Sequence, residues 1–501
     1  MLLAVRSVPL FVQALAFGAA AMYAPAIFGA VIDEHDAGRP FFYGATFFLI
    51  VLAMIALATA RTKRRMDDRQ PLATLLAIYT VLPIMLALPF HEAVPDTRFL
   101  NAYLEMVSAL TTTGASVFEA DRLPMTIHLW RGIVGWLGGL LIWITAFAVL
   151  APLTLGGFEV TSETEVGSGD ARASGAHADP QERIMRFALR LTPIYVLLTG
   201  LLWLLLVVVG QNPATGLLNA MATLSTSGIT AGQTIGEAGG GGLAELAVFV
   251  FFFFAISRRF FEGGLQPDLK EIASDRELRI ALIFVLSVPV FLFLRHWIGA
   301  FEVDGTLGEE AIPALWGGMF MVMSFLTTTG LESSSWDEAQ NWSGLGTPGL
   351  LLAGIALFGG GVATTAGGVK LLRVYALYKH GLREMERLIH PSSIGRAGYA
   401  GRRLRREGAA IAWIFFMLFA LSIAVVMALL ALTGINFDES AILAIASLST
   451  TGPVAVVATE APIVYSELPE AAKIVLAAAM VVGRMETLAI LALLNPDFWR
   501  N

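Results

Sequence analysis

The sequence predicts an all-α polytopic membrane protein with about ten spans, and three observations lead to that fold class. First, 56% of the 501 residues are hydrophobic and only 15% are charged, with a mean hydropathy of +0.70. Second, about ten apolar runs approach the ~20 residues that a helix needs to cross a bilayer. Third, one five-residue pattern occurs four times between these runs. Repeated units that are incomplete alone predict an assembly around a common axis.

The composition narrows the classes of function. The formal net charge of −7 is modest, and no basic domain suggests binding to nucleic acid. Because the chain has no cysteine, it has neither a disulfide framework nor a cysteine metal site. The first apolar segment, Val8–Val31, is too long for a typical signal peptide. We therefore expect a retained span, with cleavage as the alternative.

The apolar runs group into one hairpin and four similar units. The first two runs carry no copy of the pattern and are expected to form an N-terminal two-span hairpin, residues 1–66. The other eight form four units of span, pore loop and span, predicted at residues 67–160, 161–268, 269–400 and 401–501. The runs lie at about residues 8–31, 41–60, 71–90, 129–154, 185–210, 243–264, 278–300, 347–378, 410–433 and 470–495.

The repeated pattern reads leucine, hydroxyl residue, threonine, hydroxyl residue, glycine. Its copies, numbered 1 to 4 in chain order, are Leu110–Gly114, Leu224–Gly228, Leu326–Gly330 and Leu448–Gly452. The segments before them, such as Phe99–Leu110 and Ala311–Leu326, are too short to cross a bilayer but long enough for re-entrant half-helices. The alternative is four unrelated helix ends that their hydroxyls merely cap. Such capping is compatible with lining a pore.

Four such segments converging from one chain predict a pore for a cation. Non-helical backbone survives at membrane depth only where it lines a water-filled cavity or is buried in protein. Consecutive carbonyl oxygens ending at a glycine can replace the water shell of an ion, and the partly negative C-terminal ends of half-helices favour a cation. The predicted filter residues are Thr112, Thr113, Gly114, Thr226, Ser227, Gly228, Thr328, Thr329, Gly330, Thr450, Thr451 and Gly452.

Charged residues in the loops predict the orientation of the spans. Lys and Arg gather after the second run, around residues 258–279, and in the connector Lys370–Arg406, which is the most basic of all. Asp and Glu dominate the opposite loops, such as residues 302–310 and 460–470. Because basic loops stay in the cytoplasm, we expect both termini to be cytoplasmic and the four copies to open outward.

These features resemble the membrane subunits of the Trk/Ktr/HKT superfamily of potassium transporters, and most of all the bacterial Trk-type ion-translocating subunit with its additional N-terminal hairpin. The resemblance covers essentially the whole chain. In that family one glycine in each of four pore loops marks the potassium filter. The matching glycines are Gly114, Gly228, Gly330 and Gly452. Plant relatives with serine at the first position are sodium-selective, so the glycine there favours potassium. The chain departs from commoner family forms at Ser227–Ile229 and at Glu332, which bears on the degree of selectivity.

Two interruptions of the later hydrophobic runs also match the family. Five glycines between Gly359 and Gly368 oppose a continuous helix, since each costs about 1 kcal/mol relative to alanine; a simple kink is the alternative. Arg484 lies about 16 Å along a helix from Lys473, near mid-membrane, where a charge is expensive. Glu486 would not share its helix face. The alternative to a functional arginine is therefore an ion pair with another span.

The resemblance implies roles for both interruptions. The family places a gating loop at the first and an arginine barrier in the pore at the second. The implied gating residues are Gly359, Gly360, Gly361, Thr364, Thr365, Gly367, Gly368, Lys370 and Arg484. The resemblance also implies K⁺ as the transported ion, uptake across a bacterial inner membrane, a homodimer, and a cytosolic nucleotide-binding regulatory subunit. The natural docking surface for that regulator is the basic connector together with the polar linker Thr161–Gln181. Neutralising four arginines of the connector together should weaken regulator binding; they are Arg402, Arg403, Arg405 and Arg406.

Other functions remain as alternatives. The first is a sodium-permeable channel of the same fold. A secondary transporter with discontinuous helices would have inverted repeats, whereas the four copies share one orientation. A membrane-embedded enzyme would need a His/Asp/Glu constellation at membrane depth. The predicted spans offer essentially Arg484 and Glu486 there, so no enzyme activity is expected. Gly344–Gly349 fits a dinucleotide-binding pattern but follows no strand. Glu119 and Glu332 lie just beyond two copies and either concentrate cations there or are ordinary surface charges.

Overall fold

The structure is a computed structural model that describes residues 8–59, 70–160, 180–262, 274–299, 311–390, 399–459 and 461–494, together with Ile272. Within these ranges the regular elements are all helices and no strand occurs, which confirms the all-α prediction. Seven of the described helical stretches are long and apolar enough to cross a membrane. They are Leu10–Val31, His35–Thr59, Gln70–Ala93, Met125–Leu150, Pro180–Val209, Arg276–Leu294 and Gly408–Leu432.

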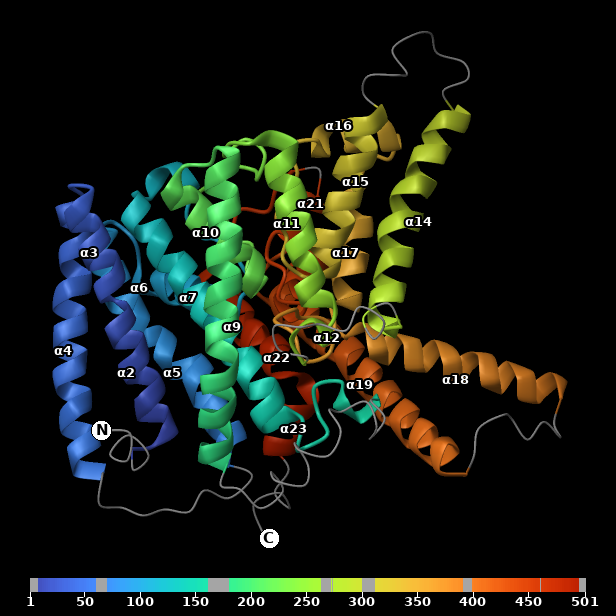
Figure 1. The fold of residues 1–501 in the computed structure, drawn as a ribbon, viewed down its shortest axis with the longest axis horizontal. Helices are drawn as coiled ribbons and strands as arrows, with labels where there is room; N and C mark the ends of the chain where they lie inside the picture. Colours follow the sequence, from blue (N-terminus) through green and yellow to red (C-terminus); the bar gives the residue numbers. More distant parts are fainter. Residues whose placement is uncertain are drawn as a thin grey trace.

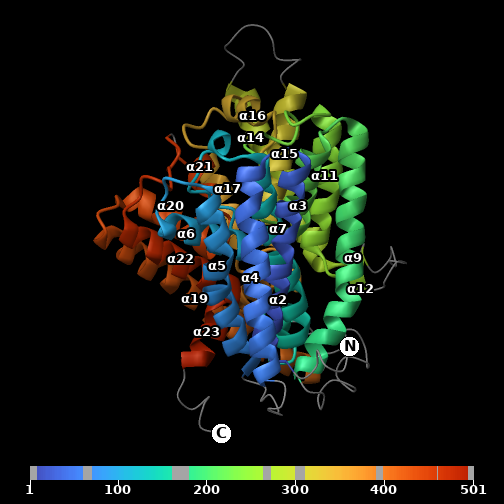
Figure 2. The same cartoon turned by 90° about the vertical axis from the view of Figure 1, so that its left-hand side faces the viewer.

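The N-terminal hairpin stands at one side of the bundle, in blue in Figures 1 and 2. Its arms comprise α2 (Leu10–Ala21), α3 (Tyr23–Val31) and α4 (His35–Thr59). Small residues let the arms approach closely, since a Cβ at Gly29 would lie 3.1 Å from the Cα of Gly38. Large side chains such as Phe47 and Leu57 are exposed. An exposed apolar face on a span is expected where the surrounding solvent is lipid.

The remaining chain forms four units, each with a long helix, a short helix and a second helix. The long helices are α5 (Gln70–Ala93), α9 (Pro180–Val209), α14 (Arg276–Gly299) and α19 (Tyr399–Leu432). The short helices are α6 (Phe99–Leu110), α10 (Pro213–Ser225), α15 (Ala311–Leu326) and α20 (Phe437–Leu448). The second helices are α7 (Met125–Thr145), α11 (Gly241–Ile256), α17 (Gly349–Phe358) and α22 (Glu470–Met485). Each short helix ends within or directly before a copy of the repeated pattern.

Shorter elements connect or extend these helices. They are η1 (Ala120–Arg122), the π-helical turn η2 (Ala146–Leu150), η3 (Phe158–Val160), α12 (Arg259–Glu262), α16 (Trp336–Ser343), α18 (Leu371–Ile389), α21 (Val454–Val457) and α23 (Thr487–Leu494). In Figure 1, α2 begins and α23 ends at the lower side of the molecule. This lower side is called inner below, and the opposite side outer.

Three predicted runs, 243–264, 347–378 and 470–495, are not continuous helices. The first breaks at Ser257, where the backbone is extended (φ −135°, ψ 126°) and the hydroxyl donates to Asp275. The second breaks at Gly359, as its glycines predict. The third breaks at Glu486, which adopts a left-handed conformation (φ 65°). Neither Ser257 nor Glu486 carries a helix-breaking signal of its own, and the total number of spans stays a prediction.

The eighth run is also redirected. After the break, α18 is a separate helix that extends sideways from the bundle, crosswise to the long helices, in Figure 1. It packs beside α19, which begins at Tyr399. The predicted unit boundary at residue 400 therefore falls just inside this helix.

Candidate functional site

The four copies of the pattern share one backbone conformation. Their central threonines are left-handed, with φ between 53° and 57° at Thr112, Thr226, Thr328 and Thr450. In each copy the next amide donates to the carbonyl five residues earlier over 2.8–3.0 Å, as Thr113 does to Ser108. This bond closes the C-terminus of the short helix. A β-branched residue rarely adopts positive φ, so the central threonine is a strained position that the pattern alone does not reveal.

The glycines bring the copies into contact in ring order. A Cβ at Gly114 would collide with the carbonyl oxygen of Ser227 in copy 2, and one at Gly228 with that of Thr329 in copy 3. A Cβ at Gly330 would lie 2.6 Å from Cγ of Pro453, next to copy 4. The ring closes where the amide of Gly452 donates to the carbonyl of Thr113 in copy 1, at 2.5 Å. The four copies thus form one closed ring.

Close approach and backbone conformation both require glycine in this ring. Gly114, Gly228 and Gly330 have φ of 72°, 61° and 75°. Gly452 does not have a left-handed φ. It needs glycine because a Cβ there would collide with the backbone of Ala115 in copy 1. In copy 4, therefore, crowding alone excludes a side chain, whereas copies 1 to 3 need glycine for both reasons.

All four glycines line one cavity of about 350 Å³ on the outer side. Its wall includes the glutamates that follow copies 1 and 3, Glu119 and Glu332. Glu332 is part-buried, and burial together with the carboxylates of Asp337 and Glu237 raises its pKa. The cavity is therefore open to ions from outside and has acidic groups on two sides.

In copies 1 to 3 the hydroxyl groups of the pattern bind one another or nearby groups, whereas in copy 4 the hydroxyls of Ser449 and Thr450 have no hydrogen-bond partner in the described part of the chain. In copies 1 and 3 the two outer hydroxyls pair at 2.8 Å, between Thr111 and Thr113 and between Thr327 and Thr329. The two serines of copy 2 pair in the same way at 2.9 Å. The central threonines of copies 1 and 3 bind groups on the inner side instead. The hydroxyls thus stabilise the helix ends and also connect the ring to what lies beneath it.

Beneath the ring lies the inner loop, Gly359–Lys370. Thr365 donates its hydroxyl hydrogen to the carbonyl of Leu224 in copy 2 at 3.1 Å. The amide of Gly367 donates to the hydroxyl of Thr328 in copy 3 at 2.7 Å. The same glycine faces copy 4, because a Cβ on it would collide with the hydroxyl of Thr450. The loop thus contacts three of the four copies from the inner side.

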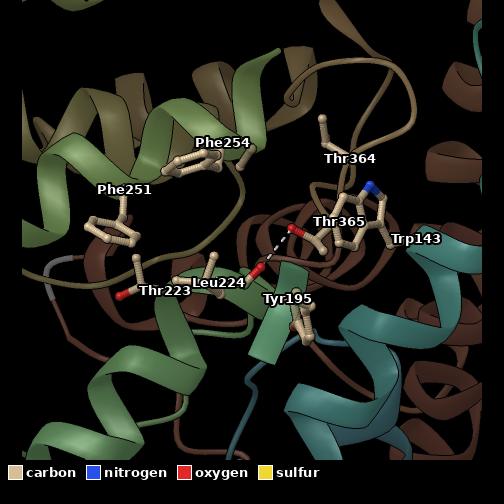
Figure 3. Close-up of a pocket in the computed structure, with 9 residues that line it drawn as sticks. Trp143, Tyr195, Thr223, Leu224, Phe251, Phe254, Thr364 and Thr365 are labelled. Carbon is tan, nitrogen blue, oxygen red and sulfur yellow. Dashed lines mark hydrogen bonds between the residues drawn. The ribbon is translucent and has the colours of Figure 1, made fainter. Parts of the chain in front are cut away.

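Aromatic side chains confine the loop on one flank. Figure 3 shows Thr364 and Thr365 beside Trp143 and Tyr195, with Phe251 and Phe254 across the space and the bond to Leu224 drawn as a dashed line. The space between them measures about 10 Å³, at or below what a single water needs. The loop therefore cannot move toward this wall unless the aromatic side chains rearrange.

Arg484 reaches the remaining copy. Its Nη2 donates to the hydroxyl of Thr112 in copy 1, and the residue is 3% exposed. Within the described residues no carboxylate forms a salt bridge with it, so the alternative of a structural ion pair with another span has no support there. Arg484 shares a cavity of about 20 Å³ with Gly367, Lys370 and Glu486. The inner loop and Arg484 together therefore contact all four copies of the ring.

A buried ion triad lies directly inside these groups. Arg373 of α18 donates to Glu159 at 2.5 Å and to Glu486 at 2.8 Å, and it has no exposed surface. Its guanidinium also lies 3.6 Å from the ring centre of Phe415. The triad joins unit 1, the end of the inner loop, and the break after Arg484. The sequence analysis did not identify Arg373 or Glu159. The only signal was an arginine five residues after the last glycine of the Gly359–Gly368 segment.

Some predicted residues lie partly or wholly outside the description. The linker Thr161–Gln181 is described only at Pro180 and Gln181, which belong to α9. Residues 391–398 of the basic connector are outside the described ranges. The side chains of Arg402, Arg403, Arg405 and Arg406 are also outside them, although their backbone belongs to α19. Regulator docking on these residues stays a prediction.

Comparison with known proteins supports one family. The family model described as "TrkH: Cation transport protein" matches residues 280–498. The Trk system potassium uptake protein TrkH of Vibrio parahaemolyticus is 30% identical over 504 residues, which cover 97% of each chain. The TrkH of Escherichia coli K12 is 29% identical over 481 residues, 94% of each chain.

A solved structure extends the likeness to three dimensions. The crystal structure of the potassium transporter TrkH from Vibrio parahaemolyticus has a TM-score of 0.80 against this chain at 26% identity, covering 99% of both chains. The likeness therefore includes the N-terminal hairpin as well as the four units. With the helices described above, it supports a multi-pass membrane protein.

Proposed function

This chain belongs to the TrkH family of cation transport proteins, and from this we propose that it takes up K⁺ across a bacterial inner membrane through the ring of four glycine loops. The observation that carries the proposal is the closed ring, in which each copy of the pattern contacts the next around a shared outer cavity. A ring of backbone carbonyls is the established way for a protein to replace the hydration shell of K⁺. The transport role of the family is consistent with the expectation that this chain is not an enzyme.

The proposed filter comprises the last three residues of each copy. These are Thr112–Gly114, Thr226–Gly228, Thr328–Gly330 and Thr450–Gly452. Support comes from the backbone, because the left-handed threonine and the five-residue hydrogen bond recur in all four copies. Four equivalent backbone segments arranged in a ring can offer an ion equivalent carbonyl oxygens. The hydroxyls that pair behind this backbone reduce its freedom to collapse on a smaller ion.

We propose that the inner loop and Arg484 form the gate. Support comes from their contacts with all four copies from the inner side. A K⁺ leaving the ring would meet the guanidinium at about 6 Å, where the repulsion at an effective dielectric of ~20 is about 3 kcal/mol. That energy slows passage roughly a hundredfold. Gly359 and Gly368, with φ of 71° and 73°, would serve as hinges when the loop moves.

The remaining features of the proposal concern the membrane and partners. We propose cytoplasmic termini, a homodimer and a cytosolic nucleotide-binding regulator, with units at residues 67–160, 161–268, 269–400 and 401–501 after the hairpin 1–66. Basic residues at the inner ends of helices, among them Arg258 and Arg276, support the orientation. The Trk system of the relatives supports a regulatory partner. The amphipathic α18 and the beginning of its neighbour α19 lie toward the inner side, where such a partner would bind.

Flux through the purified protein in liposomes tests this function. We expect K⁺ flux to exceed Na⁺ flux at equal gradients, with no dependence on an added proton gradient. Equal fluxes of K⁺ and Na⁺ would favour the sodium-permeable alternative. Accumulation of K⁺ against its gradient only when a proton or Na⁺ gradient is imposed would favour a secondary transporter.

A further inference from the structure

A buried glutamate without an ion pair lies behind the ring. Glu245 belongs to α11, the second helix of unit 2, and is 1% exposed. Among the described residues no Lys, Arg or His forms a salt bridge with it. A buried carboxylate is normally paired or bound by several donors. Its surroundings therefore need an explanation.

Four hydrogen-bond donors converge on this carboxylate. Oε2 accepts from the indole of Trp316 at 2.7 Å and from the hydroxyl of Ser333 at 2.8 Å. Oε1 accepts from the amide and the hydroxyl of Ser334, at 2.7 and 2.8 Å. An indole and an amide can only donate. The site is thus built to hold two accepting oxygens, as an ionised carboxylate provides.

These donors place the charge directly behind copy 3. Trp316 is on the short helix α15, and the two serines follow Gly330 by three and four residues. The segment after copy 2 closes the other side, because a Cβ at Gly236 would lie 3.0 Å from Oε1 of Glu245. Glu245 therefore holds the outgoing segment of copy 3, residues 331–335, against that of copy 2.

Copy 1 has a similar carboxylate with a different charge balance. Glu105 of α6 accepts from the amide of Val117, three residues after Gly114, at 2.8 Å. Its other oxygen accepts from Nε of Arg131 at 2.6 Å. The charge of Glu105 is thus neutralised by a buried arginine. Copies 1 and 3 lie opposite each other in the ring, yet only copy 1 has this compensation within the described residues.

Copies 2 and 4 are held by other groups. Behind copy 2 the amide of Gln211 donates to the carbonyl of Ile235 at 2.9 Å and accepts from Asn219 at 3.1 Å. In copy 4 the phenol of Tyr465 donates to the carbonyl of Gly452 at 3.3 Å. Both arrangements are neutral. Of the two fully buried carboxylates that bind the outgoing segments of copies 1 and 3 in the described residues, Glu105 and Glu245, only Glu105 therefore has a basic partner.

We propose that Glu245 is a positioning residue that sets the affinity of the ring for K⁺. It fixes the outgoing segment of copy 3 through four bonds, and its negative charge is balanced by the cation in the ring rather than by a basic side chain. The inference rests on the proposed function. Because an opposite charge near the ring attracts the cation, removing it should weaken K⁺ binding, and a loss of about 1.4 kcal/mol would correspond to about tenfold.

The test is thermal unfolding of the purified full-length protein in K⁺, Na⁺ and choline chloride at equal ionic strength. A ligand that binds only the folded state stabilises it by RT ln(1 + [L]/Kd), so the unfolding temperature rises with the ligand concentration relative to Kd. We expect wild type to be stabilised by K⁺ beyond Na⁺ and choline. The K⁺ midpoint is here the K⁺ concentration that gives a fixed rise in the unfolding temperature over choline. In Glu245→Gln this midpoint should rise about tenfold. In Glu245→Asp, which keeps the charge, it should rise less.

Control variants separate charge from packing. Ser334→Ala removes one hydrogen bond but keeps the carboxylate, and it should lower the unfolding temperature equally in all three salts. If Glu245→Gln does the same, with an unchanged K⁺ midpoint, Glu245 is only structural and the inference fails. If Glu245→Gln does not fold, Glu245→Asp carries the test: a rise of the K⁺ midpoint of about tenfold or more in this variant, which keeps the charge, would overturn the inference, and a smaller rise would support it. Absence of any K⁺-specific effect in wild type would instead contradict the proposed filter.

Discussion

On the outer side the four units adopt nearly the same backbone, whereas on the inner side their second helices end in four different ways. The central threonines differ by only a few degrees in φ, from 53° to 57°. By contrast, α7 continues through the π-helical turn η2, and α11 ends at an extended serine. α17 ends at Gly359 and α22 at a left-handed Glu486. In the proposed function, equivalence is kept where an ion is surrounded, and it is lost where the inner loop and Arg484 close the path.

The two sides also differ in how charge is used. Around the outer cavity, acidic groups face a space that ions can enter. On the inner side, Arg484 and the triad around Arg373 are buried and in contact with the loop or its ends. An outer acidic group attracts cations, whereas the inner arginine opposes their passage. Four substitutions test this contrast, in order of decreasing expected effect.

Loss of the triad arginine should have the largest effect. Arg373→Gln leaves Glu159 and Glu486 buried without their partner, and breaking a buried pair costs about 3–5 kcal/mol. We expect a clear fall in the unfolding temperature, measured by fluorescence in detergent. Arg387→Gln, which removes an exposed pair with Glu384 on the same helix, should change it little. Equal effects of the two variants would show that the triad does not hold the inner side together.

Removal of the inner arginine should open the path without changing its preference. Arg484→Ala should raise regulator-independent K⁺ flux by up to about a hundredfold, from the repulsion of about 3 kcal/mol. The K⁺/Na⁺ ratio in liposome flux should stay that of wild type, because the substitution removes a bond to the Thr112 hydroxyl and leaves the backbone carbonyls of the ring in place. Lys473→Ala, on the same helix but bound to Asn101, is the control and should not raise the flux. Unchanged flux in a well-folded Arg484→Ala would rule out the gate assignment.

A side chain in the ring should act in the opposite manner. Gly330→Ser must place a Cβ 2.6 Å from Pro453 at a φ of 75°, so the ring should widen or distort. We expect the K⁺/Na⁺ flux ratio to fall about tenfold, equivalent to about 1.4 kcal/mol. Gly346→Ser has no atom within 4 Å of the new Cβ and serves as the matched control. An unaltered ratio in Gly330→Ser at normal expression would count decisively against the filter.

The outer acidic group should give the smallest effect and a pH signature. Because the pKa of Glu332 is raised by burial, Asp337 and Glu237, this carboxylate gains its proton earlier than usual as the external pH falls. Uptake at low K⁺ should therefore decline about two- to threefold with acidification, from a loss of less than about 1 kcal/mol of attraction. Glu332→Gln should be low at all pH values, and Asp337→Asn should move the decline to lower pH. A wild-type pH profile in Glu332→Gln would remove Glu332 from the pathway.

Several features of this comparison follow from local sequence. The short helices α6 and α15 have the bounds predicted from their apolar segments, since the repeated pattern marks where each must stop. The break at Gly359 follows from five glycines in ten residues. The lengths and composition of the apolar runs were sufficient to predict the membrane-protein class and to propose the grouping into units. All of these depend on residues close together in the chain.

Other features depend on partners far apart in the chain. Arg373 pairs with carboxylates 214 and 113 residues away, and Arg484 contacts a threonine 372 residues away. Glu245 accepts from serines nearly 90 residues later. The order of contacts around the ring and the breaks at Ser257 and Glu486 likewise arise from packing between units. Hydropathy and repeats thus determined the membrane-protein class and the four copies of one pattern. Only the tertiary structure decided which buried charges meet, because that depends on distances the chain order does not encode.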